Sequence, residues 1–214
     1  MRDEYQVQLA LVGELLSAMA EDVGTAMRRA TSGLLGADRA AAESVLADHP
    51  NLVAQRDQVE QRTYELVALQ APVAADLRVL LTAPRVAGDL ERMGNLARHV
   101  ARAALRRYPE RAVVDELAGV FASMADTAVR MADKMRAVVA DHDAELAAQL
   151  DRDDDELDEL HRRMFRIMFA DGWRHGAEAA VDAALLGRYY ERYADHAVNA
   201  AGQVIYLVTG EHTG

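Results

Sequence analysis

Asp89-Leu-Glu-Arg-Met-Gly-Asn-Leu-Ala-Arg98 recurs in outline as Tyr189-Tyr-Glu-Arg-Tyr-Ala-Asp-His-Ala-Val198, one hundred positions later in a chain of 214 residues. Each copy holds a glutamate followed four residues later by an oxygen-bearing side chain, Asn95 in the first copy and Asp195 in the second. On a helix, residues at i and i+4 lie on the same face. The repeat therefore predicts two copies of one helical unit, each with a polar helix face suited to a metal ion.

A weaker match upstream extends the repeat, because Asp38 matches Asp143 at a spacing of 105 residues. The change in spacing from 105 to 100 predicts a five-residue deletion between the second and third helices of the later half, since loops tolerate changes of length best. We therefore predict an all-α fold of two tandem three-helix bundles, with six long helices and an internal pseudo-twofold repeat. Residues 1–109 would form the first repeat and residues 110–214 the second.

Apolar residues follow a helical period along almost the whole chain. The predicted helices are Leu9 to Gly33–Gly36, Ala37 to Leu69, Pro72 to Tyr108, Val113 to Val139, Ala144 to Phe169, and Val181 to Val208. Two of these helices contain an interior proline, Pro50 or Pro84, which predicts a kink or a break because it removes a backbone donor and costs roughly 3 kcal/mol. Methionines at helical spacing, among them Met124 and Met131, are expected in the core.

The composition agrees with a helical fold and limits the chemistry. Apolar residues make up 51% of the chain but aromatic residues only 5%, which favours closely packed helices over a strand-rich sandwich. The chain has no cysteine, so disulfides and thiolate metal sites are excluded. The same absence permits an intracellular setting.

The formal net charge of -11 limits the partners. It repels nucleic-acid phosphates and anionic lipid, so we expect no nucleic-acid binding and a cationic ligand or a basic partner surface instead. The N-terminal residues lack the layout of a signal peptide, and no apolar stretch of about 18 residues exists to span a bilayer. We expect a soluble protein without membrane insertion.

The two polar helix faces are candidates for metal binding. Mg²⁺ and Mn²⁺ favour carboxylate and carbonyl oxygens, and iron accepts carboxylates together with imidazole. Because two ligands from one helix do not close a site, further ligands are expected from the second helix of each half. The predicted ligands are Asp48, Glu91 and Asn95 in the first half and Asp154, Asp158, Glu191 and Asp195 in the second. The neutral amide of Asn95 predicts that the first site binds its cation less tightly.

Two other interpretations of these acids stay open. Glu91 and Glu191 would form ordinary ion pairs with arginines if their helix faces were simply solvated. The segment Asp158-Glu-Leu-His161 resembles half of the Glu-x-x-His motif of di-iron bundles, although the first half has no second copy. No nucleophile motif or phosphate-binding glycine loop supports catalysis, so we expect a protein that is not an enzyme, with a carboxylate-bundle metalloenzyme as the alternative.

Four segments together resemble one known family, the PhoU family of bacterial phosphate-signalling regulators. They are Gln70-Ala-Pro-Val-Ala-Ala-Asp-Leu-Arg78, Asp89-Leu-Glu-Arg-Met-Gly-Asn95, Arg188-Tyr-Tyr-Glu-Arg-Tyr-Ala-Asp-His-Ala-Val-Asn199 and Tyr206-Leu-Val-Thr-Gly210. The resemblance covers nearly the whole chain, and the first segment and the doubled Glu-Arg motif are specific in combination.

The resemblance implies a six-helix fold of two three-helix bundles that is commonly a homodimer. It implies a cytoplasmic negative regulator of the phosphate-starvation response, which couples a high-affinity phosphate ABC transporter and its ATPase to a sensor histidine kinase. It also implies metal clusters on the bundle surface, here of Fe, Mn, Mg or Zn. Carried over residue by residue, the metal motif falls on Glu91, Glu191 and Asp195, and the acidic positions of the second helices fall on Asp48, Asp154 and Asp158.

Overall fold

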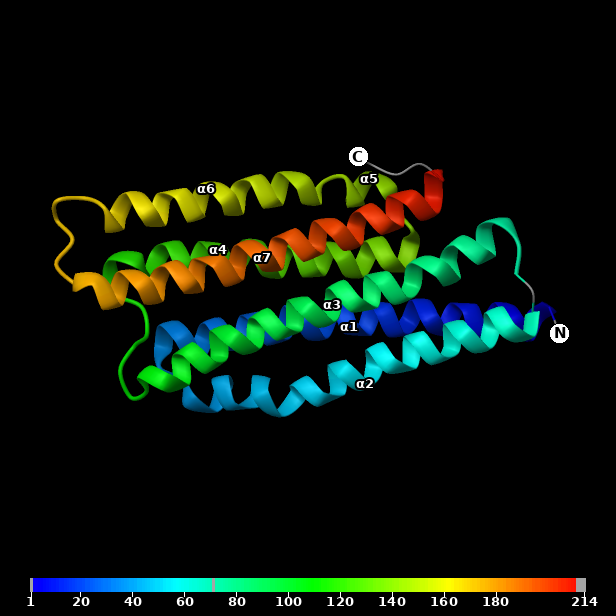
Figure 1. Cartoon of the computed structure of the whole chain (residues 1–214), viewed down its shortest axis with the longest axis horizontal. Helices are drawn as coiled ribbons and strands as arrows, with labels where there is room; N and C mark the ends of the chain where they lie inside the picture. The colour runs from blue at the N-terminus through cyan, green and yellow to red at the C-terminus, as the bar shows by residue number, and fades with distance from the viewer. Residues whose placement is uncertain (1, 71, 211–214) are drawn as a thin grey trace.

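The computed structural model of the chain describes residues 2–70 and 72–210 and shows an all-helical molecule (Figure 1). The helices are α1 (Arg2–Gly36), α2 (Arg39–Gln70), α3 (Ala74–Arg107), α4 (Asp115–Asp141), α5 (Ala144–Ala147), α6 (Leu150–Met168) and α7 (Gly176–Thr209). Six of them are long and α5 is a single turn, so the predicted fold class of six long helices in tandem bundles is confirmed. The described residues contain no strand.

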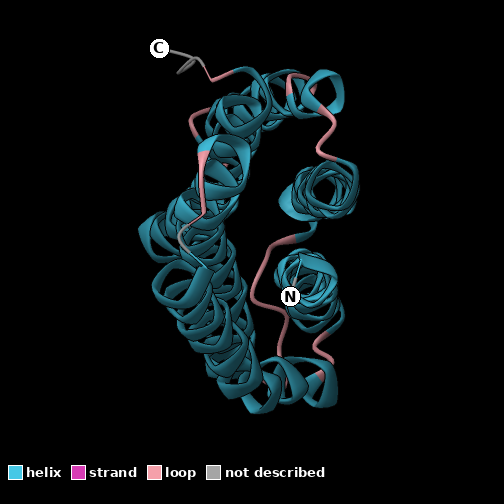
Figure 2. Ribbon diagram, turned by 90° about the vertical axis from the view of Figure 1, so that its right-hand side faces the viewer, coloured by secondary structure: helices cyan, strands magenta, loops and turns pink. Residues whose placement is uncertain are grey.

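The two repeats pack side by side through their first and third helices. Within the repeats, α2 packs on α1 and α3, and α6 packs on α4 and α7. Between them, α1 contacts α4 and α3 contacts α7. The second helices consequently lie at opposite edges of the molecule, with α2 along the bottom and α6 along the top of Figure 1, and the end-on view shows the helices running alongside one another (Figure 2).

One apolar core runs through both repeats. The methionines predicted to fill it, including Met124 and Met131, are fully buried. Burying each large apolar side chain contributes roughly 1.5–3 kcal/mol, so the core is the main source of stability. The hydroxyl of Tyr190 on α7 lies 2.6 Å from Thr31 Oγ1 on α1, which ties the two repeats together inside this core.

Neither interior proline breaks its helix. Pro50 lies within α2 and Pro84 lies within α3, and both helices continue through them. The α2 ribbon changes direction along its length while staying continuous (Figure 1). Packing against α1 and α3 keeps α2 helical through Pro50.

The second repeat departs from the predicted helix ends at two places. The predicted helix from Ala144 to Phe169 is divided into α5 and α6 by a turn at residues 148–149, where Gln149 N–H donates to the Leu146 carbonyl three residues back. The Asp143 side chain caps the start of α5 by accepting a hydrogen bond from the Leu146 N–H. The last helix begins at Gly176, five residues before the predicted Val181. The apolar pattern used for prediction starts inside this helix, whereas its first turn is mostly exposed.

Residues 108–114 connect the repeats, between α3 and α4, and the predicted boundary at 109/110 falls inside this loop. The division of the chain into two domains there stays a prediction. Among the described helices, none is long and apolar enough to span a membrane.

Candidate functional site

The repeated Glu-Arg motifs lie on the third helix of each repeat, where Glu91 pairs with Arg56 of α2 and Glu191 lies against His161 of α6. The line of contact between the second and third helices of a repeat is called its groove below. In the second repeat, α6 carries Asp154 and Asp158, and α7 carries Glu191 and Asp195. These four predicted metal ligands therefore come from two helices in direct contact. The groove between α6 and α7 is the candidate cation site.

Asp154 is the centre of negative charge in this groove. Its Oδ1 atom is buried and has no hydrogen-bond partner. Burial, together with repulsion from Asp195, Asp158 and other acids of α6, raises the pKa of Asp154 to about 6. An ionised carboxylate in this position is therefore destabilised by its surroundings, and a cation bound beside it would relieve that cost.

Glu191 is held at the edge of the same groove by two cationic or polar neighbours. Arg188, one turn earlier on α7, forms an ion pair with Glu191, with 2.6 Å between Nη1 and Oε1. His161 Nδ1 lies 3.5 Å from Glu191 Oε2, and His161 Nε2 is buried without a hydrogen-bond partner. Asp158 faces Arg162, whose Nη2 lies 3.4 Å from Asp158 Oδ2. His161 therefore lies next to the predicted ligand Glu191, although it was not among the predicted ligands.

The first repeat has the same backbone arrangement but different side-chain partners. Arg56 Nε lies 3.1 Å from Glu91 Oε2, close enough for an ion pair although the N–H does not point at the oxygen. His49 Nε2 donates to Asn95 Oδ1 over 3.0 Å. Glu91 is therefore already neutralised, and the oxygen of Asn95 is already occupied by a donor.

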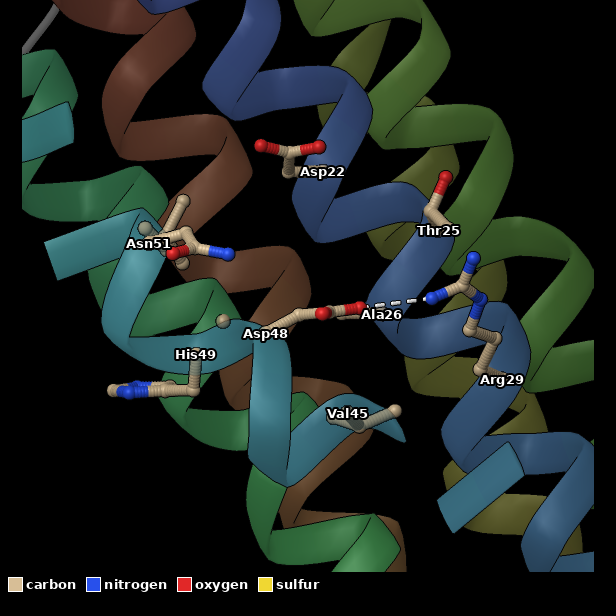
Figure 3. A pocket seen from close by; sticks show the side chains of 10 residues that line it. Asp22, Thr25, Ala26, Arg29, Val45, Asp48, His49 and Asn51 are labelled. Atoms are coloured by element: carbon tan, nitrogen blue, oxygen red, sulfur yellow. Dashed lines mark hydrogen bonds and ion pairs between the residues drawn. The ribbon is translucent and has the colours of Figure 1, made fainter. Parts of the chain in front are cut away.

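Asp48 does not join Glu91 and Asn95 as predicted. Arg29 Nη1 on α1 donates to Asp48 Oδ2 over 2.9 Å, and both residues line a cleft of about 180 Å³ between α1 and α2. The close-up shows Asp48 pointing towards Arg29 while His49 points to the opposite side of α2 (Figure 3). One residue along an α-helix turns the side chain by about 100°, so a shift of one position moves the acid out of the groove.

The spacing of 105 residues explains which side chains correspond. His49 contacts Asn95, and the residue 105 positions later is Asp154, which interacts with Asp195. Arg56 contacts Glu91, and 105 positions later His161 contacts Glu191. The true counterpart of Asp48 is Asp153, which is buried and bonded to Arg130 and Lys134 on α4. The repeat signal was thus sufficient to find these pairs.

The donors in the two grooves differ in their fit to a metal ion. In the part of the chain that the structure describes, no three His, Cys, Asp or Glu side chains lie close enough to hold a metal as they stand. The orphaned Asp154 oxygen and its acidic neighbours nevertheless match the oxygen chemistry of a hard divalent cation. The first-repeat set does not fit, because Asp48 is turned away towards Arg29 and the neutral Asn95 already accepts a hydrogen bond from His49.

A family model described as the PhoU domain matches residues 16–104 and again residues 121–204. This chain belongs to the PhoU family. The two matches coincide with α1–α3 and α4–α7, so each repeat is one PhoU domain. The resemblance inferred from the doubled Glu-Arg motif is thereby confirmed.

Curated PhoU relatives match the chain along nearly its whole length. Proteins of Mycobacterium bovis and Mycobacterium tuberculosis, each named phosphate-specific transport system accessory protein PhoU homolog 2, are 45% identical over 98% of this chain and 99% of theirs. A Mycobacterium leprae protein, PhoU homolog 1, is 45% identical over 98% of this chain and 95% of its own.

Solved PhoU structures have the same fold. The crystal structure of PhoU from Pseudomonas aeruginosa superimposes with a TM-score of 0.84 at 25% identity, covering 97% of this chain and all of that one. The phosphate transport system regulatory protein PhoU from Streptococcus pneumoniae superimposes with a TM-score of 0.85 at 20% identity, covering 98% and 99%.

Proposed function

We propose that this chain is an accessory protein of a phosphate-specific transport system and a cytoplasmic negative regulator of the phosphate-starvation response. The observation that carries the proposal is the 45% identity, over 98% of the chain, to mycobacterial proteins named as accessory proteins of that system. Two matches to the PhoU domain in one chain support it.

The proposed partners are the ATPase of a high-affinity phosphate ABC transporter and a sensor histidine kinase. Long helices leave extended faces for protein contact, and the net charge of -11 favours basic surfaces. Complementary charge accelerates association and is screened by salt, so binding to either partner should weaken as ionic strength rises. A homodimer is part of the same proposal.

We further propose that the second repeat binds a divalent or iron-type metal ion through Asp154, Asp158, Glu191 and Asp195. The support is chemical: these side chains supply oxygen ligands, and Asp154 has a buried oxygen without a partner. Arg188 would have to release Glu191 for the carboxylate to reach the ion. The ion would offset repulsion between carboxylates and fix α6 against α7, which is a structural or tuning role and not a catalytic one.

The regulatory proposal is tested by deletion of the gene. Phosphate-starvation genes should stay switched on in phosphate-rich medium, and a plasmid copy of the gene should restore repression. The strain must lack every PhoU homologue, because a second copy would conceal the effect. Normal repression in that background would refute the regulatory role.

The partner proposal is tested by pull-down with the cytoplasmic part of the kinase or with the transporter ATPase. Binding should fall across a series of rising salt concentrations. Binding that is absent at low salt, or that does not change with salt, would contradict docking through charged helix faces.

A further inference from the structure

The groove of the first repeat carries positive charge at the place where the second repeat carries acids. Arg98 and Arg102 lie one turn apart on α3. Burial is the main cause that lowers the pKa of His49 and of His99, and the nearby charges of Arg98 and Arg102 lower both pKa values further. The amide of Asn95 lies in the same groove, one turn before His99. This group of His49, Asn95, Arg98, His99 and Arg102 is called the basic groove below.

The two arginines of the basic groove are not neutralised by the protein. In the described residues, neither Arg98 nor Arg102 forms an ion pair, and Arg98 Nε is a buried donor without an acceptor. Burial and the charge of Arg102 both lower the pKa of Arg98, while Glu91 acts weakly in the other direction. Glu91 itself is already paired with Arg56. Two like charges at i and i+4 repel each other, so an anion between them would be stabilising.

The corresponding positions of the second repeat lack this chemistry. At the spacing of 100 residues, Arg98 corresponds to Val198 and Arg102 to Gly202. At the spacing of 105, His49 corresponds to Asp154. The basic groove is therefore specific to the first repeat and is not a consequence of the fold.

We propose that the basic groove binds a tetrahedral oxyanion of the phosphate class, through the guanidinium groups of Arg98 and Arg102. A guanidinium presents a planar fork of N–H donors that matches two oxygens of a phosphate, and two such forks balance the charge of a phosphate dianion. His49 already donates its N–H to Asn95, and the His99 ring stacks on Tyr189 of α7, so the two guanidinium groups are the donors of the proposed site. The proposal stands on the charges of the first repeat, so it can fail or succeed independently of the regulatory role.

The test is isothermal titration of the full-length protein with inorganic phosphate in a chloride buffer of constant ionic strength. The parent protein should bind phosphate saturably, and Arg98→Gln with Arg102→Gln should weaken binding at least about tenfold. The matched control is Arg163→Gln with Arg174→Gln, which removes two exposed arginines that form no ion pair among the described residues of the second repeat. The control should bind phosphate like the parent.

A second variant covers the case in which the double variant does not fold. Arg102 is exposed, so Arg102→Gln alone should leave the circular dichroism spectrum unchanged and weaken phosphate binding several-fold. Titration with O-phosphoserine distinguishes the two sources of the oxyanion. Binding of inorganic phosphate would identify a free ion as the ligand, and binding of O-phosphoserine alone would identify a phosphorylated molecule. No saturable binding of either probe, or equal binding by the parent and the Arg98/Arg102 variants, would overturn the proposal.

Discussion

The two PhoU domains of this chain place the same helix pair around grooves of opposite chemistry. In the second repeat, Asp154 and Asp195 repel each other, and the Oδ1 atom of Asp154 is buried without a hydrogen-bond partner. In the first repeat, the same two positions hold His49 and Asn95, which form a hydrogen bond with each other. A repeat can thus keep its fold while its polar groups change from a pair of repelling acids into a hydrogen-bonded pair, so the motif alone does not fix the chemistry of each copy.

The largest expected effect is the loss of metal binding in the second repeat. Asp154→Asn with Asp195→Asn keeps the shape of both side chains but removes two charges, so the affinity for Mn²⁺ should fall by about 100-fold. Equilibrium dialysis with metal analysis measures this change.

Asp48→Asn is the matched control for that experiment, because it also removes an acid from a second helix but one that pairs with Arg29. It should leave the affinity for Mn²⁺ unchanged. Loss of metal in the control, or full retention in the double variant, would contradict the assignment of the cation site to the groove between α6 and α7.

A smaller effect is expected from converting the first groove into the second. The fourfold change His49→Asp, Val53→Asp, Arg56→His and Asn95→Asp installs the second-repeat residue at each differing position, including the counterpart of Asp158. The variant should bind one additional divalent cation, although about tenfold more weakly than the second repeat, because Arg98 and Arg102 remain nearby. An unchanged metal stoichiometry would show that the backbone of the two grooves is not equivalent.

Asp154 also predicts a pH dependence of stability. Its pKa is about 6 in the folded protein and about 3.9 in an unfolded chain, so the folded state holds the proton more tightly. Its contribution to stability is therefore complete below about pH 4 and is lost as the pH rises through 6. Partial exposure to water limits this loss to about 1 kcal/mol.

Asp154→Asn isolates the effect, because asparagine stays neutral at every pH. The difference in the free energy of unfolding between variant and parent should grow from near zero at pH 4 to about 1 kcal/mol in favour of the variant at pH 7. Urea denaturation without metal, at both values of pH, measures it. A difference that does not change with pH would mean that the carboxyl is not destabilised by its neighbours.

The smallest effect is expected at the exposed ion pair between α1 and α2. Asp48→Ala removes the bond to Arg29, and both side chains are about half exposed. Exposed ion pairs contribute little, so the free energy of unfolding should change by less than about 1 kcal/mol. Thermal unfolding of the metal-free protein tests this. A larger loss would indicate that the cleft beside Asp48 is a structural or ligand site.

The sequence predicts the fold well because core packing follows a period. Apolar spacing identifies all six long helices, and the doubled Glu-Arg motif identifies the tandem repeat. The separate turn of α5 was missed, since the break after it is a local turn at residues 148–149 that apolar spacing does not encode. Of the predicted kink or break at each proline, the break does not occur, because tertiary packing keeps α2 and α3 continuous through Pro50 and Pro84.

The site was predicted less completely because it depends on side-chain direction. Asp48 and His49 are adjacent in sequence, yet one faces α1 and the other faces α3. Applying the spacing of 105 residues along the whole second helix aligns His49 with Asp154 and would have corrected the choice. The partners Arg56 and His161 could be found in the same way, whereas the buried orphan oxygen of Asp154 requires coordinates.

The most direct test of the opposite chemistry of the two repeats is a backbone amide NMR titration of one isotope-labelled sample with Mg²⁺ and another with inorganic phosphate. Mg²⁺ should shift resonances around Asp154 on α6 and Asp195 on α7, and phosphate should shift resonances around His49 on α2 and Arg98 on α3. Shifts from both ions in the same repeat, or from Mg²⁺ equally in both repeats, would contradict the account.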